Sequence, residues 1–209
     1  MTMNRVRALN IASYRKAGTS FTYYPKKSDL HDNFSRDLLD MKSGLRPELE
    51  SLFVLRLLEF IVLNNLNLTG IVRILGHDEM YAEANHPLHR VAMQLANKTG
   101  IPFHYDWFTK PLTPKTASLG SRAERFAHIH GTYSVALPHH STEPMRILVI
   151  DDVVTSRTTA QEVHRALREA NPNVECYFFA LAESYHRNTM ARPQNIVRTP
   201  DRYHYPHAA

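Results

Sequence analysis

Apolar side chains recur at helical spacing in four stretches of the chain. Their spacing predicts helices over residues 28–42, 47–65, 87–98 and 159–170. Pro47 suits the first position of a helix, because the N–H that proline lacks would have no partner there. Gly100 follows the third stretch, where glycine commonly ends a helix. These signals set the helical part of the expected fold.

Short runs rich in Ile, Val, Leu and Phe lie between these helices. They predict strands over residues 68–75, 101–108, 129–136, 145–150 and 174–182. The run 145–150 is almost wholly apolar, which is typical of a strand buried on both faces of a parallel sheet. Strands that alternate with helices indicate an α/β domain with a mostly parallel sheet flanked by helices.

Polar composition separates this core from both ends of the chain. Residues 1–28 are polar and aromatic and predict irregular structure, whereas residues 109–127 predict a long basic loop. We therefore expect three parts. They are a basic N-terminal extension with helices over 1–66, an α/β core over 67–184, and a basic C-terminal tail over 185–209.

Charge is distributed unevenly along the chain, whose formal net charge is +5. Residues 1–28 contain six Lys or Arg and no acid, and residues 185–209 contain four Arg and a single acid. Two basic ends favour an anionic partner, which could be nucleic acid, a phosphorylated metabolite or an acidic protein. The alternative is a pair of solvated ends without a partner.

Composition excludes several classes of protein. Hydrophobic residues make up 43% of the chain, which excludes a disordered or collagen-like protein. The single cysteine, Cys176, excludes an internal disulfide and a multi-cysteine zinc site. The longest apolar run, near residues 52–63, contains Arg56 and Glu59 and is too short to span a membrane. We expect a soluble, cytoplasmic protein without a membrane partner.

Residues suited to binding chemistry follow the apolar run that ends at Ile150. Asp151 and Asp152 are adjacent carboxylates, and the hydroxyl-rich segment 155–159 leads into the next predicted helix. In open α/β sheets, ligands bind at the carboxyl ends of the strands. A helix N-terminus attracts phosphate, and carboxylates accept hydrogen bonds from sugar hydroxyls or hold Mg²⁺ through water. The pattern predicts a sugar-phosphate site; the alternative is an acid pair that only caps the helix.

Residues 147–159, ILVIDDVVTSRTT, resemble the signature of type I phosphoribosyltransferases. The resemblance implies that family's α/β fold and the binding of 5-phosphoribosyl 1-pyrophosphate (PRPP) as co-substrate together with Mg²⁺. It implies that Asp151 and Asp152 contact the ribose and hold Mg²⁺ through the ligand or water. It also implies a phosphate-binding loop composed of Val153, Val154, Thr155, Ser156, Arg157, Thr158 and Thr159.

Three further segments, 39–44, 94–102 and 125–133, are similar to elements of ComF-like proteins. Those proteins are associated with DNA uptake and are similar to amidophosphoribosyltransferases. By resemblance, Gly76 and His77 belong to the loop that receives pyrophosphate. A closing basic loop would stabilise the charge of the transition state through Lys110, Lys115, Arg122 and Arg125. The alternative for these four residues is an ordinary basic surface loop.

Two departures from the family pattern lead to two hypotheses. Arg157 stands where the family has glycine, so it adds a phosphate contact, fills the pocket or changes the loop's shape. Asp78 and Glu79 have the wrong charge for a pyrophosphate loop. One hypothesis is a phosphoribosyltransferase that uses a nitrogen nucleophile. The other is a non-catalytic or specialised accessory protein, for example of DNA uptake or of a phage-defence cassette such as a retron. A homodimer is also expected.

Overall fold

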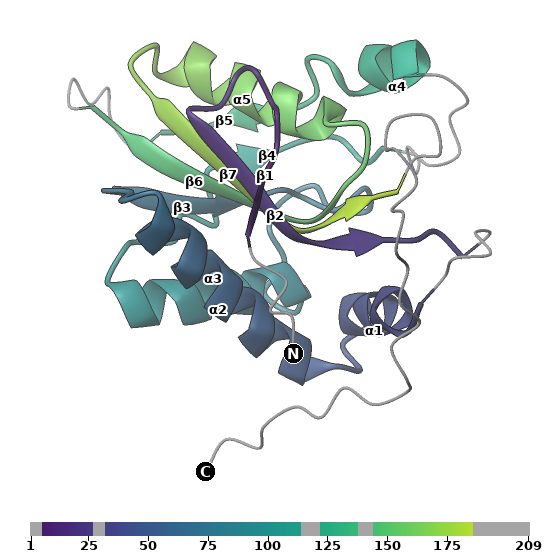
Figure 1. The fold of residues 1–209 in the computed structure, drawn as a ribbon. Coiled ribbons are helices and arrows are strands. Elements are labelled where there is room, and N and C mark those ends of the chain that lie inside the picture. The colour runs from purple at the N-terminus through teal and green to yellow at the C-terminus, as the bar shows by residue number, and fades with distance from the viewer. Residues whose placement is uncertain (1–5, 27–31, 114–121, 138–143, 186–209) are drawn as a thin grey trace.

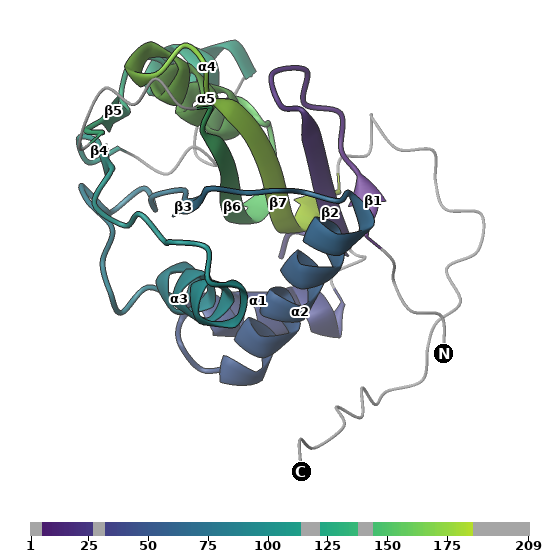
Figure 2. The same cartoon turned by 90° about the vertical axis from the view of Figure 1, so that its left-hand side faces the viewer.

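A three-layer arrangement organises the protein. The computed structural model describes residues 6–26, 32–113, 122–137 and 144–185. A five-stranded sheet lies between two groups of helices (Figure 1). The side view in Figure 2 shows helices α1, α2 and α3 on one face of the sheet and α4 and α5 on the other. None of these described helices is long and apolar enough to cross a membrane.

The central sheet is mostly parallel, as predicted. Its strands follow the order β1-β2-β7-β6-β3, and every pairing is parallel except that of β1 with β2. The strands are β1 (Arg7–Ala8), β2 (Lys16–Tyr23), β3 (Gly70–Arg73), β6 (Arg146–Val154) and β7 (Glu175–Ser184). A separate antiparallel pair consists of β4 (Phe108–Thr109) and β5 (Ser134–Val135). The expected α/β fold class is therefore confirmed.

The helices largely follow the apolar periodicity. They are α1 (Asn33–Lys42), α2 (Pro47–Leu63), α3 (Pro87–Thr99), α4 (Arg122–Ile129) and α5 (Thr158–Ala170). The side chain of Asp32 caps α1 by accepting a hydrogen bond from the Ser35 amide at 2.8 Å. Gly100 ends α3 in the left-handed conformation, with φ of 73°. In the described part of the chain, four of the five helices were expected, and α4 was not.

The irregular structure expected for residues 1–28 is wrong for Lys16–Tyr23, which form β2 alongside β7. This segment was missed because its buried residues are mostly small or polar rather than a Val- or Ile-rich run. Thr19 and Ser20 are almost fully buried. A Cβ atom on Gly18 would lie only 2.8 Å from the Phe60 ring, so glycine allows α2 to pack closely on β2.

Other expected boundaries also need correction. The predicted strand 129–136 is wrong over most of its length, because α4 continues to Ile129 and Gly131 then turns with φ of 78°. Only Ser134–Val135 is a strand there. The predicted strand 101–108 is reduced to a bridge at Phe103 and the start of β4. In contrast, β6 is longer than expected, since it includes Asp151 and Asp152.

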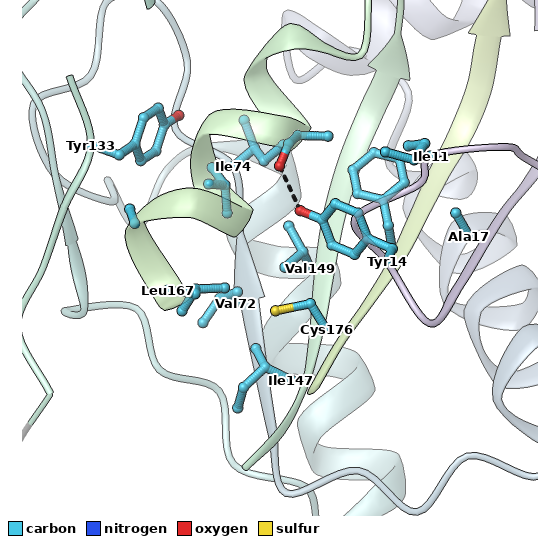
Figure 3. Packing of buried hydrophobic residues seen from close by; sticks show 14 of the residues in the cluster. Ile11, Tyr14, Ala17, Val72, Ile74, Tyr133, Ile147, Val149, Leu167 and Cys176 are labelled. Carbon is cyan, nitrogen blue, oxygen red and sulfur yellow. Dashed lines mark hydrogen bonds between the residues drawn. The ribbon is translucent and has the colours of Figure 1, made fainter. Parts of the chain in front are cut away.

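Alternating side chains of β6 support both helical layers. Ile147 and Val149 pack against the α5 face, and Leu148 and Ile150 pack against the α2 and α3 face. Figure 3 shows the first of these clusters, in which the Tyr14 hydroxyl donates a 2.8 Å hydrogen bond to the backbone oxygen of Ala160. Because β6 is buried on both faces, packing fixes its direction and therefore the position of the two aspartates near its carboxyl end.

Candidate functional site

A cavity of about 720 Å³ lies beyond the carboxyl ends of β3 and β6. It brings together residues from seven parts of the chain: the end of α1, the loop after β3, the start of α3, the segment after β4, the end of α4 with the turn that follows, the end of β6 and the first turn of α5. The predicted site residues in its lining are Gly76, His77, Lys110, Asp151, Asp152, Val153 and Thr159. Segments separated by up to about a hundred residues thus meet at the sheet edge where open α/β proteins bind ligands.

The two aspartates are largely enclosed and bonded to their own backbone. Asp151 accepts a hydrogen bond from the Asp152 amide at 2.8 Å, and Asp152 accepts one from the Val153 amide at 2.5 Å. Burial and the neighbouring charge of Asp152 raise the pKa of Asp151 well above its usual range, and Lys42 offsets only part of that effect. The pair therefore has less negative charge at neutral pH than two ordinary carboxylates.

Lys42, the last residue of α1, completes this group. Its Nζ lies 2.9 Å from Oδ2 of Asp152. Desolvation lowers the pKa of Lys42, but the charge of Asp152 and the hydrogen bond to it prevail and raise that pKa above its ordinary value. Sequence reasoning did not assign Lys42 to the site. The available signal was the segment 39–44, which resembles an element of ComF-like proteins.

The loop between β6 and α5 has the shape that a glycine would allow. Arg157 itself adopts the left-handed conformation, with φ of 64°, at the N-cap of α5. Its guanidinium donates to Glu183 at 2.8 Å and to the backbone oxygen of Asn10 at 2.7 Å, and Arg157 is not among the residues that line the cavity. Of the three roles considered for Arg157, these bonds give no support to filling the pocket, and a phosphate contact and a changed loop shape stay predictions. The described residues supply no side-chain cap for the first turn of α5.

The remaining residues of this loop differ in their exposure. Val154 and Thr158 are buried, whereas Thr155 is exposed. The Thr158 hydroxyl donates a 2.8 Å hydrogen bond to the Ser156 hydroxyl, which tightens the turn. Thr159 belongs to the cavity lining. The cavity is therefore bordered here by the first turn of α5, where N–H groups point outward and attract anions.

The loop after β3 is closed by Glu79. Arg73 donates to both carboxylate oxygens of Glu79, and one of these bonds measures 2.7 Å. The amides of Gly76 and Glu83 donate to the same carboxylate at 2.6 and 3.1 Å. Arg73 and Glu79 are only 1% and 3% exposed. Burial raises the pKa of Glu79, but these hydrogen bonds outweigh it and hold that pKa at about 2.

This arrangement corrects the expectation for Glu79, whereas Asp78 still places a negative charge in the loop. The carboxylate of Glu79 is paired with the guanidinium of Arg73, so it does not oppose a ligand in the cavity. Asp78 belongs to the cavity lining and has a side chain that is 75% exposed, so it alone places a carboxylate there in this loop. The amide of Gly76 is already bonded to Glu79 and is not free for an anion.

Among the described residues of the predicted basic loop, Lys110 is the cation that borders the cavity. It is only 6% exposed, and its Nζ lies 3.3 Å from the backbone oxygen of His77 and 3.4 Å from the Thr113 hydroxyl. Desolvation lowers its pKa, although Glu79 and Asp78 act in the opposite direction. Arg125 lies on α4, outside the cavity lining. Lys115 and the side chain of Arg122 lie outside the described residues.

Tyr133 secures the end of β3 and was also missed as a site residue. Its hydroxyl donates to the backbone oxygen of Leu75 and accepts from the Leu75 amide, both at 3.1 Å. Burial raises its pKa strongly, so it stays a neutral phenol. Tyr133 lies in the segment 125–133 noted for its resemblance, but nothing in that pattern indicated its role.

The acid pair does not fit a Mg²⁺ ion coordinated directly by the protein. Mg²⁺ prefers several oxygen ligands in near-octahedral geometry. Here Asp152 is already paired with Lys42, and Asp151 and Asp152 each accept a backbone amide. Within the described residues, no group of three His, Cys, Asp or Glu side chains could hold a metal. Contact with Mg²⁺ through the ligand or water stays a prediction.

Comparisons with known proteins give a weak structural likeness. No family model matches the chain, and no relative is found among curated proteins. Adenine phosphoribosyltransferase from Leishmania tarentolae is similar with 13% identity and a TM-score of 0.44, over 85% of this chain and 94% of that one. The adenine enzyme from Leishmania donovani has 11% identity and a TM-score of 0.37, over 92% and 96% of the two chains.

The xanthine-guanine-hypoxanthine phosphoribosyltransferase of Helicobacter pylori is similar with 9% identity and a TM-score of 0.35, over 79% of this chain and 89% of that one. At these scores the likeness concerns the general arrangement of the chain and carries no argument about the site. None of these comparisons singles out ComF-like proteins. The fold class itself, a mostly parallel α/β sheet flanked by helices, rests on the strand pairings described above.

Proposed function

We propose that the cavity binds a phosphoribosyl group, as found in PRPP or a nucleotide. One observation carries the proposal: two adjacent carboxylates at the end of a buried parallel strand share a cavity with the first turn of α5. Carboxylates accept hydrogen bonds from sugar hydroxyls, and backbone amides at a helix N-terminus attract phosphate. The resemblance of residues 147–159 to the phosphoribosyltransferase signature supports the same ligand.

Each part of the site has a role in this proposal. Asp151 and Asp152 accept hydrogen bonds from the ribose hydroxyls and orient the sugar. The amides and hydroxyls of residues 155–159 hold the 5-phosphate. Lys110, which belongs to the cavity lining, interacts with the group attached to C1 of the ribose. The enclosed positions of Asp152 and Lys110 favour hydrogen bonding over solvation.

The finer proposal is transfer of the phosphoribosyl group from PRPP to a nitrogen nucleophile. The bond from C1 of the ribose to the pyrophosphate oxygen breaks, and a bond from C1 to nitrogen forms. Pyrophosphate leaves with the electron pair, and the nitrogen loses a proton to solvent. Negative charge grows on the leaving group, and a positioned ammonium such as that of Lys110 lowers its energy.

Calorimetric titration with PRPP and with ribose 5-phosphate tests the binding step. We expect a micromolar Kd, equivalent to about −8 kcal/mol. The variant Asp151→Asn/Asp152→Asn should lose that binding. Asp106→Asn, an exposed acid outside the cavity lining, is the matched control and should keep it. Absence of binding at millimolar ligand would contradict the proposal. Release of pyrophosphate from PRPP in the presence of ammonia or a nucleobase tests the transfer step.

A second candidate is a protein that binds the ligand without turning it over. The bond from the Gly76 amide to Glu79 favours this candidate, because it removes a donor from the loop expected to receive pyrophosphate. Binding of ribose 5-phosphate or a nucleotide without pyrophosphate release would support it. An anionic partner, whether nucleic acid or protein, stays a prediction, because residues 186–209 of the basic tail lie outside the described residues. Steep salt dependence of nucleic-acid binding would support such a partner.

A further inference from the structure

The acid pair already has a cation supplied by the chain. Lys42 Nζ lies 2.9 Å from Asp152 Oδ2, and both residues belong to the cavity lining. The side chain of Lys42 is 42% exposed and that of Asp152 is 12% exposed. The ion pair is therefore open to the cavity on the lysine side and enclosed on the aspartate side.

The other hydrogen bonds of the pair are also made by the chain itself. Asp152 Oδ1 accepts from the Val153 amide, and Asp151 Oδ1 accepts from the Asp152 amide. A second cation bound directly at Asp152 would have to compete with the Lys42 ammonium at contact distance, where like charges repel. Both carboxylate oxygens of Asp152 are therefore already engaged by the chain, which disfavours a divalent ion bound directly at Asp152.

Lys42 is well placed to contact a bound ligand. An ammonium group has three donors, and Asp152 uses one of them. Among the described residues, the other two have no protein acceptor and remain for oxygens of a molecule in the cavity. The backbone of Lys42 is held firmly, because its neighbour Met41 is fully buried and the Ser43 amide donates to the backbone oxygens of Leu39 and Asp40.

We propose that Lys42 takes the place of a divalent cation at the acid pair. It neutralises Asp152 and donates hydrogen bonds to oxygens of the bound sugar phosphate, so that the ligand binds without Mg²⁺. This inference rests on the proposed function, and it makes Lys42 a positioning residue for Asp152 as well as a ligand contact. It assigns to α1, in the N-terminal part of the chain, a role in the site.

Calorimetric titration with ribose 5-phosphate, in EDTA and in Mg²⁺, tests the inference. This ligand lacks the pyrophosphate group of PRPP, which would itself bind Mg²⁺ and confuse the result. For the unaltered protein we expect the same Kd within about twofold in both conditions. Lys42→Met should weaken binding by at least about tenfold in EDTA, equivalent to about 1.4 kcal/mol, and Mg²⁺ should restore part of the loss. Lys42→Arg should retain most of the affinity.

Lys98→Met is the matched control, because Lys98 is exposed on α3 and lies outside the cavity lining. Urea unfolding of Lys42→Met checks that the fold is intact. A requirement for Mg²⁺ in the unaltered protein, or full affinity of Lys42→Met in EDTA, would overturn the inference and leave the proposed function standing. Absence of ribose 5-phosphate and PRPP binding by the unaltered protein in either condition would overturn both.

Discussion

Two loops begin at the same edge of the sheet, one after β6 and one after β3. They differ in whether a carboxylate of the chain itself accepts hydrogen bonds from the loop. The loop after β6, residues 155–157, leads into α5 with no side-chain cap among the described residues. The loop after β3 is closed from within, because the carboxylate of Glu79 accepts from the Gly76 amide, the Glu83 amide and the Arg73 guanidinium. The loop after β6 therefore leaves the amides at the N-terminus of α5 available to a bound anion. In the loop after β3, the donors are already bonded to the carboxylate of Glu79.

The contrast shows that strand-end position alone does not define a binding loop. Both loops follow buried parallel strands that pair with each other. The difference is that the Glu79 carboxylate occupies the donors of the β3 loop, whereas no carboxylate of the described residues does so at the start of α5. In the proposed function, the 5-phosphate therefore lies on the β6 side, and Lys110 is the cation of the described residues that borders the cavity near the β3 loop.

The largest expected effect comes from opening the β3 loop. Glu79→Ala removes the acceptor of a fully buried guanidinium and of two amides. Breaking a buried ion pair in this way costs about 3–5 kcal/mol of unfolding free energy. Urea unfolding measures the loss. Asp78→Ala, next to it and exposed, should change the unfolding free energy by less than about 0.5 kcal/mol. A loss below about 1 kcal/mol for Glu79→Ala would show that the loop is not held by this carboxylate.

Acid should weaken the same loop. Because the pKa of Glu79 is about 2 in the folded protein and near 4.5 when unfolded, its ionised form stabilises the fold above the unfolded value. That stabilisation, about 3 kcal/mol, is lost as the pH falls from about 5 to 2. Urea unfolding at several pH values measures the slope. The double variant Arg73→Met/Glu79→Gln should have a shallower slope over this range, and an unchanged slope would assign the acid sensitivity to other carboxylates.

The backbone of the β6 loop offers a smaller test. Arg157 holds the left-handed conformation, which costs a residue with a Cβ about 1 kcal/mol relative to glycine. Arg157→Ala and Arg157→Gly both remove the bonds to Glu183 and Asn10, so they differ only in that strain. Arg157→Gly should be the more stable of the two by about 1 kcal/mol in urea unfolding. Equal stability would mean that the loop changes shape once the guanidinium is gone.

The smallest expected effect concerns the hydroxyl pair of the β6 loop. Thr158→Val keeps the volume of the side chain but removes the hydrogen bond to Ser156. We expect a loss of about 1 kcal/mol in unfolding free energy, the usual contribution of one such bond. Ser43→Ala, an exposed hydroxyl at the end of α1, should lose less. A smaller loss for Thr158→Val than for this control would show that the hydroxyl pair does not tighten the turn.

Much of the fold could be predicted from the sequence where a helix is buried on one face or a strand is buried on both. The apolar run before Asp151 predicted β6, and helical spacing predicted α2, α3 and α5. Strand β2 was not predictable in this way, because Gly18, Thr19 and Ser20 are buried by close packing rather than by apolar bulk. The strand predicted over 129–136 failed because local alternation there belongs to a helix end and a turn.

The site divides along similar lines. Asp151 and Asp152 were identifiable, because they directly follow the apolar run that predicted β6. Lys42 was not, since its pairing with Asp152 depends on how α1 packs across the sheet. The role of Glu79 was misjudged because a charged residue within a strand, Arg73, normally indicates an exposed side chain. Here it is buried and creates the partner that Glu79 needs.

The parallel pairing of β2 with β7 has a consequence for how the protein folds. Lys16 lies opposite Tyr177, so the first long strand finds its neighbour only near the end of the described chain. Contacts this distant in sequence slow folding, because a long loop must close before they form. During synthesis, the edge of β2 that pairs with β7 stays unpaired until β7 leaves the ribosome, and in that interval this edge is exposed to wrong partners. Strand β2 is therefore expected to pair with β7 late in folding, and a chaperone would act most usefully just before that step.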